Sequence, residues 1–74
     1  MIYLVDFVQG TTAEDIVHYV IKNECKLLRK FSSYAYLICV ESTSTPPIKD
    51  GAFNVIPTNS DIGKVLLSDL LTKS

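Results

Sequence analysis

The sequence predicts an α+β fold, a two-layer sandwich with the element order β-α-β-β-β-α. This is a ferredoxin-like variant with both helices on one face of a mixed sheet. Three observations lead to it. Residues 34–40 (YAYLICV) carry no charge, glycine or proline, which is typical of a strand buried on both faces. Residues 12–24 and 61–72 repeat apolar side chains at helical spacing. Shorter apolar runs around them indicate further strands.

Four strands are expected, over residues 1–8, 26–31, 34–41 and 53–56. The second is partly exposed because basic residues interrupt it, and the last is followed by Pro57, which suits an edge strand or a strand end. A strand–helix–strand unit normally forms a right-handed crossover between parallel strands. The third strand is expected to return antiparallel as a hairpin, through a turn at Ser32-Ser33, so the predicted sheet is mixed.

The first helix, over residues 12–24, is expected to begin with Thr11 as its N-cap. Glu14 follows three residues later, at the spacing of a capping box. Its β-branched side chains favour a helix only weakly, so its apolar stripe must pack against the sheet. The stripe consists of Ala13, Ile16, Val17, Val20 and Ile21.

The second helix, over residues 61–72, has a broader apolar face than the first. The face consists of Ile62, Val65, Leu66, Leu67, Leu70 and Leu71. It wraps over about half of the helix, which is more than one stripe of a small core needs. Either the helix simply covers the sheet, or another protein buries part of this face.

The length and charge of the chain limit its functions. A chain of 74 residues is one domain, spanning 1–74, and it is marginally stable unless a disulfide, a metal or a partner adds to its core. The hydrophobic fraction of 47% argues against disorder. The net charge of −1 gives no electrostatic reason to bind duplex nucleic acid or an anionic membrane.

Cys25 and Cys39 are expected to be free core thiols, although a bridge between them is the alternative. No residue spacing suggests a metal site, and no cofactor is expected. The start of the chain has no signal-peptide pattern, and no apolar run is long enough to span a membrane. We therefore expect an intracellular (cytoplasmic) protein, or part of an assembly formed inside a cell, such as a virion.

The layout of residues 2–60 resembles that of the propeptide-like inhibitors of subtilisin-type proteases. Those inhibitors are also small β-α-β-β modules with a compact helix and an uncharged third strand. The resemblance implies a related fold and, as one functional alternative, inhibition of a serine protease.

The sequence does not predict an enzyme. His18 is the only histidine and lies on the polar side of the first helix, where a solvated side chain is the ordinary outcome. The apolar run around Cys39 would raise a thiol pKa, which opposes a nucleophilic role. The three glycines are isolated, so no phosphate-binding loop exists.

The leading hypothesis is a small non-enzymatic protein-interaction module, bound to a larger protein or to itself as an accessory subunit, structural subunit or inhibitor. A virus- or phage-encoded component would suit this hypothesis. Residues 42–51 (STSTPPIKDG) are expected to form a protruding loop, and long loops often carry function. The candidate partner-binding residues in this loop and in the second helix are Thr45, Pro46, Pro47, Ile48, Leu67 and Leu71.

The second hypothesis is a small nucleic-acid-binding regulator. Tyr34 and Tyr36 follow closely on the main basic cluster, and basic side chains beside aromatic ones can bind single strands by charge and stacking. The basic candidates are Lys22, Lys26, Arg29 and Lys30. The competing interpretation is an edge strand protected by its charges.

Overall fold

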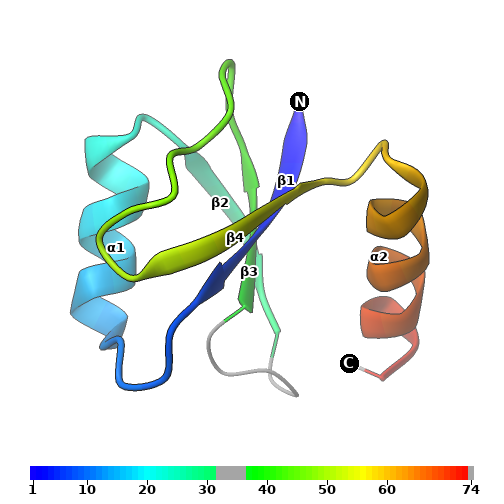
Figure 1. The fold of residues 1–74 in the computed structure, drawn as a ribbon, viewed down its shortest axis with the longest axis horizontal. Helices are drawn as coiled ribbons and strands as arrows, with labels where there is room; N and C mark the ends of the chain where they lie inside the picture. The colour runs from blue at the N-terminus through cyan, green and yellow to red at the C-terminus, as the bar shows by residue number, and fades with distance from the viewer. Residues whose placement is uncertain (32–36, 74) are drawn as a thin grey trace.

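The computed structural model describes residues 1–31 and 37–73 and has an α+β fold with one four-stranded sheet and two helices (Figure 1). In chain order the elements are β1 (Ile2–Phe7), α1 (Ala13–Lys22), β2 (Lys26–Lys30), β3 (Leu37–Glu41), β4 (Ala52–Pro57) and α2 (Asp61–Lys73). The predicted turn at Ser32-Ser33 and the first part of the predicted third strand lie outside the described residues.

The sheet is antiparallel, so the prediction of a mixed sheet is wrong. The strand order is β2-β3-β1-β4, and each neighbouring pair runs antiparallel. At the centre, Val5 of β1 lies opposite Ile38 of β3 on one side and Val55 of β4 on the other. The crossover through α1 does join two strands of the same direction, but β3 lies between them. An inserted antiparallel strand removes the parallel contact on which the prediction rested.

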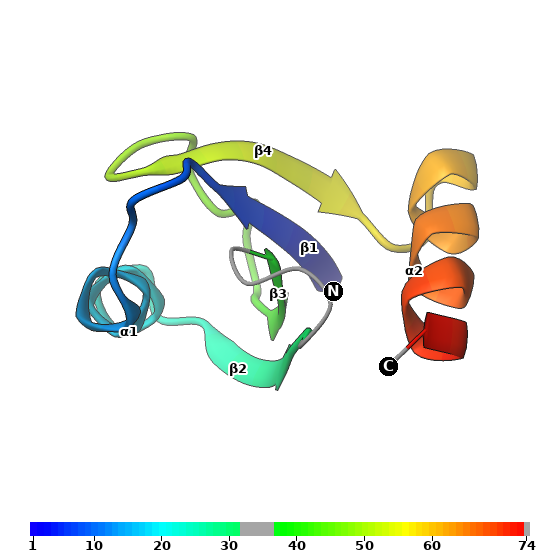
Figure 2. The same ribbon diagram turned by 90° about the horizontal axis from the view of Figure 1, so that it is seen from below.

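The prediction of two helices on one face is also wrong, because α1 and α2 cover opposite faces. Side chains alternate along β1: Tyr3, Val5 and Phe7 belong to the cluster under α1, whereas Leu4 packs with Leu70 of α2. Figure 2 shows the sheet between the two helices. The molecule therefore has three layers in the order helix, sheet, helix, and each face of the sheet has its own small core.

Helix α1 begins one residue later than predicted. Thr12 is the N-cap: its hydroxyl accepts the backbone N–H of Asp15, and the Asp15 carboxylate accepts the backbone N–H of Thr12, both at 3.1 Å. This is the predicted capping box shifted by one position, with Asp15 in place of Glu14. A hydrogen bond from Thr11 Oγ1 to the Val8 carbonyl holds the residue expected as the cap in the preceding turn.

The buried side of α1 also differs from the predicted stripe. Ile16, Tyr19 and Val20 are buried, whereas Val17 and Ile21 are exposed. The Tyr19 and Phe7 rings pack in a T-shaped arrangement, with a centroid distance of 5.2 Å and an interplanar angle of 89°. A large ring that packs against β1 turns the helix toward the Tyr19 side and leaves the two β-branched side chains in solvent.

Helix α2 packs against β1 and β4. Gly63 lies so close to the end of β4 that a Cβ at this position would overlap the carbonyl oxygen of Pro57. Farther along, Leu70 is buried and Leu67 is half-buried in the cluster with Leu4. The close approach at Gly63 and the two leucines hold the helix on its face of the sheet.

Strands β2 and β4 are the edges of the sheet, as the basic residues of β2 and Pro57 predicted. The described part of the predicted central strand is confirmed as an interior strand, in which Ile38 to Val40 are buried. Cys25 packs against the cluster under α1 and Cys39 belongs to the cluster under α2, and both are free thiols. The sheet separates them, which excludes the alternative of a bridge in this fold.

Candidate functional site

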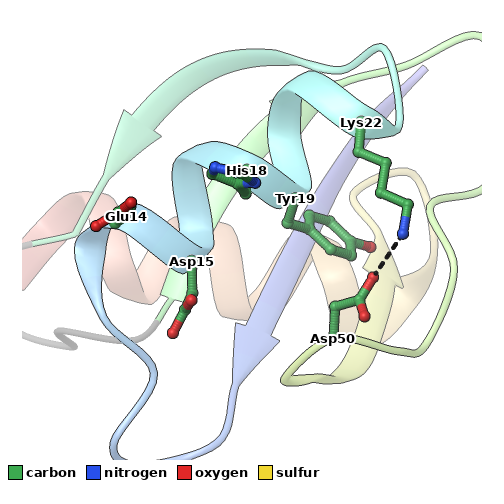
Figure 3. Close-up of a pocket in the computed structure, with 6 residues that line it drawn as sticks. All are labelled: Glu14, Asp15, His18, Tyr19, Lys22 and Asp50. Atoms are coloured by element: carbon green, nitrogen blue, oxygen red, sulfur yellow. Dashed lines mark ion pairs between the residues drawn. The ribbon is translucent and has the colours of Figure 1, made fainter.

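The first candidate region is a hollow between α1 and the turn before β4, with a volume of about 330 Å³ (Figure 3). Lys22 Nζ lies 3.5 Å from Asp50 Oδ2 across it, and the Tyr19 ring lies between α1 and Asp50. Both charged side chains are at least half exposed, so this ion pair adds little stability. The lining residues are Glu14, Asp15, His18, Tyr19, Lys22 and Asp50.

Tyr19 and Asp15 of this hollow make hydrogen bonds within the protein. The Tyr19 hydroxyl donates to the Pro47 carbonyl at 2.7 Å, and burial raises the pKa of Tyr19 to about 12. The backbone N–H of Thr12 holds the pKa of Asp15 below its usual value. His18 is exposed, as the sequence predicted. The hydrogen bond from Tyr19 to Pro47 and the ion pair between Lys22 and Asp50 connect this part of the loop to α1.

The second candidate region, the basic cluster, is not gathered on one surface. Lys22 faces Asp50, and Lys26 lies opposite Glu41 in the sheet. Arg29 lies opposite Cys39, whose side chain is on the α2 face, with its guanidinium 5.4 Å from the Phe31 ring centroid.

Lys30 lies opposite Ile38, whose side chain is on the α1 face. By the alternation of a strand, Arg29 and Lys30 therefore point to different faces. Two of the four basic residues have acidic neighbours and the other two diverge, which does not form a continuous track for a phosphate backbone. Tyr34 and Tyr36 lie outside the described residues.

The third candidate region is the loop 42–51, which is fastened to the body of the protein in its middle. The Tyr3 hydroxyl lies 3.4 Å from Thr45 Oγ1, Pro46 is buried, and Pro47 accepts the hydrogen bond from Tyr19. Ile48 is 66% exposed. The loop is therefore fastened at residues 45–47, and among its four candidate residues Ile48 presents the largest apolar side chain to solvent.

The fourth candidate region is α2. Of the two residues predicted there, Leu67 is half-buried against the sheet and Leu71 is exposed. Three further apolar residues are exposed on one side of the helix: Ile62 at 68%, Val65 at 70%, and Leu66 at 37%. With Asp61 they line an apolar hollow of about 310 Å³. We call Ile62, Val65 and Leu66 the α2 flank.

The choice of the α2 flank over Leu67 and Leu71 was beyond sequence reasoning. The three residues of the α2 flank, Leu67 and Leu71 all belong to the same predicted apolar face, and the sheet could have covered any part of that face. The spacing of Ile62, Val65 and Leu66, at positions i, i+3 and i+4, was a visible signal that they form one group.

Comparisons with protein-family models, with curated proteins and with solved structures found no match. Within residues 1–31 and 37–73, no group of three or more His, Cys, Asp and Glu side chains is placed to hold a metal ion. No helix in the described part of the chain is long and apolar enough to cross a membrane.

Proposed function

We propose that this protein is a small non-enzymatic interaction module that binds another protein through the α2 flank, as an accessory subunit, structural subunit or inhibitor. One observation carries the proposal: Ile62 and Val65 are about two-thirds exposed and Leu66 more than a third, although all three belong to the apolar face of an amphipathic helix. Large apolar side chains grouped on one surface are typical of an interface.

The spacing of the α2 flank supports a particular mode of binding. Apolar anchors at i, i+3 and i+4 are those by which an amphipathic helix lies in a groove of its partner. Asp61 adjoins these anchors in the same hollow. The partner chemistry that fits is an apolar groove with a basic side chain at its rim, near the start of α2.

The strand order supports the proposal that the fold is a variant of the ferredoxin-like plait. Elements β1, α1, β2 and β3 follow the order that begins this plait, and β4 lies beside β1. The position of α2 after β4, on the other face, departs from the plait. This departure exposes the α2 flank, because one helix covers its face of the sheet alone.

To test the proposal, the protein is purified from the cells that produce it naturally, and the proteins that copurify with it are examined for a partner present in an equal molar amount. The purified partner is then titrated with the wild-type protein, with Val65→Asp and with Lys64→Gln. We expect Val65→Asp to lose at least about 2 kcal/mol of binding free energy, because a charge would enter a desolvated groove.

Lys64→Gln is the matched control, since it makes the net charge more negative by the same one unit, and Lys64, one or two positions from each flank residue, lies on a different exposed side of α2. It should bind like the wild type, and both variants should keep the far-ultraviolet circular dichroism of the folded protein. Binding that survives Val65→Asp unchanged, or the lack of any equal-amount partner, would contradict the proposal.

A further inference from the structure

We infer that two copies of this protein pair through their β4 edges, as antiparallel strands about a two-fold axis, to form a continuous eight-stranded sheet. This inference does not rest on the proposed function, because it uses a different surface from the α2 flank. It begins from the strand order, in which β4 is the last strand on its side of the sheet. In Figure 2 no drawn element lies beyond β4 on that side.

The backbone of Val55 points out of this edge. The Thr58 N–H donates to the Ile2 carbonyl at 3.0 Å, so Ile2 and Thr58 form a hydrogen-bonded pair of the ladder. Hydrogen-bonded and non-hydrogen-bonded pairs alternate between antiparallel strands. The pairs Leu4–Ile56 and Asp6–Asn54 are therefore hydrogen-bonded, and Val55, opposite Val5, turns its N–H and C=O away from β1.

The two edges of the sheet differ in their protection against pairing. Edge strands are normally protected by charged side chains, proline or bulges. Strand β2 has three basic residues among its five, and its pairing with β3 is irregular between Leu27 and Arg29. Strand β4 (AFNVIP) carries no charge. The register shift of β4, opposite Asp6 and Phe7, passes over Phe53, and its proline is the last residue, so residues 54–56 form the regular part of this edge.

The charges of the two edges select a second copy through β4. Two β2 strands paired about Leu28 would place Lys26 opposite Lys30 twice, and like charges directly opposite each other destabilise a sheet. Two β4 strands paired about Val55 oppose neutral residues.

The two-fold register is limited to a few residues around Val55. Val55 of each copy would donate to and accept from Val55 of the other, which forms one closed hydrogen-bonded pair. On either side of this pair, Asn54 of each copy would lie opposite Ile56 of the other, so neither pair contains a charged residue. Beyond Pro57 the ladder cannot continue, because proline has no N–H. The two-fold pair uses the β4 edge of both copies, so the pairing closes at a dimer.

The test removes the one donor that pairing needs and the folded monomer does not. The 74-residue chain can be assembled by ligation at Cys39, which allows an N-methyl group to be placed on Val55. Sedimentation velocity over a range of concentrations then compares the wild type, the N-methyl-Val55 protein and Leu28→Lys. Leu28→Lys is the matched control, because it adds a charge to the other edge.

We expect the wild type and Leu28→Lys to sediment as twice the 8.2 kDa monomer, with a Kd below about 1 mM. The N-methyl-Val55 protein should be a monomer with unchanged circular dichroism. Hydrogen exchange at the Val55 amide should slow as the wild-type concentration rises. A wild type that stays monomeric, a dimer that survives N-methylation, or a series of larger species would each overturn the inference.

Val65→Asp separates this inference from the proposed function. The charge on the α2 flank should leave the dimer intact, and the N-methyl-Val55 protein should still bind a partner of the α2 flank. Loss of dimerisation in Val65→Asp would place the self-contact on α2 and overturn the pairing of β4.

Discussion

Tyr19 joins three parts of the molecule. Its ring packs in a T-shaped arrangement with Phe7 in the core under α1, and its hydroxyl donates to Pro47 in the loop that leads to β4. The ring is 1% exposed, so the hydroxyl would lack a partner if the loop moved away. A buried hydroxyl without a hydrogen bond is costly, so Tyr19 holds the loop in place.

Tyr19→Phe should lower the free energy of unfolding by about 1 kcal/mol at pH 8, because the Pro47 carbonyl loses its donor. Burial raises the pKa of Tyr19 from 10.0 to about 12. Because the folded-state pKa is the higher one, the stabilisation is fully present below pH 10.0 and is lost as the pH rises through about 12. Urea unfolding between pH 8 and pH 12 should therefore show the wild type losing its advantage over the variant.

Tyr3→Phe is the control for this measurement. It removes a longer contact, 3.4 Å to Thr45, from the same loop, so it should cost less than Tyr19→Phe. Equal losses from the two variants, or an advantage of the wild type that does not change with pH, would contradict the role of Tyr19.

The residue-scale errors of the sequence prediction have local causes. Thr11 and Thr12 both stand three residues before an acidic residue, so the sequence allows two capping boxes. The structure uses the second, because Thr11 bonds back to Val8. Tyr19 was missing from the predicted stripe because a tyrosine can lie on either side of an amphipathic helix. Its place depends on Phe7, which lies far away in the sequence.

At the scale of elements, α2 packs against β1 and β4, and its first turn lies close to the end of β4. Its contacts with the sheet include Gly63 near Pro57, and Leu67 and Leu70 in the cluster with Leu4. The position of the helix therefore depends on the absence of a side chain at residue 63. An exposed helical glycine normally costs about 1 kcal/mol relative to alanine, but Gly63 is buried and has a packing reason.

Gly63→Ala should destabilise the protein by about 1–3 kcal/mol, although alanine is the better helix former, because its methyl group would push α2 away from β4. Urea unfolding measures the change. Ser68→Ala, an exposed substitution in the same helix, is the control and should be neutral or slightly stabilising. A Gly63→Ala variant as stable as Ser68→Ala would show that the helix can shift without loss.

The existence of every element could be predicted from the sequence, and the way the helices meet the sheet could not. The capping residues and apolar periodicity are local signals, and they predicted α1 and α2 with small errors at their ends. Which side of α2 faces the sheet depends on the close approach at Gly63. For this reason the sequence could not distinguish Val65, which the structure leaves exposed, from Leu67 and Leu71, which were predicted to bind a partner.

At the scale of the whole molecule, the sheet divides the interior into two cores. Tyr3, Val5 and Phe7 belong to one, and Leu4 belongs to the other. A two-layer fold would have left one face of the sheet open to solvent. The three-layer arrangement covers both faces with one helix each. The only sign of the second core in the sequence was that Leu4 and Cys39 are apolar. A central strand buried on both faces, as predicted, already requires that both faces of the sheet be covered.

The two cores should make the two thiols react differently. Cys39 is buried under α2, and burial raises the pKa of its thiol, whereas Cys25 is partly exposed beside β2. At pH 8 a thiol reagent should modify Cys25 rapidly and Cys39 slowly in the folded protein, because thiolate and access are both needed. Reaction time courses of Cys25→Ala and Cys39→Ala, followed by absorbance, assign the two rates.

Unfolding in urea should bring the two rates together, since both side chains are then in water. The remaining thiol of Cys25→Ala is Cys39. If this variant, when folded, reacts as fast as folded Cys39→Ala, the placement of Cys39 between the sheet and α2 is contradicted.

The position of β1 also has a consequence for synthesis on the ribosome. This strand leaves the ribosome before the others, yet its two neighbours are residues 37–41 and 52–57. While the chain between is being made, Tyr3, Leu4, Val5 and Phe7 have no sheet to join. A nascent chain that exposes so apolar a strand is a natural substrate for chaperones, and its folding should be set by the slow closure of distant contacts.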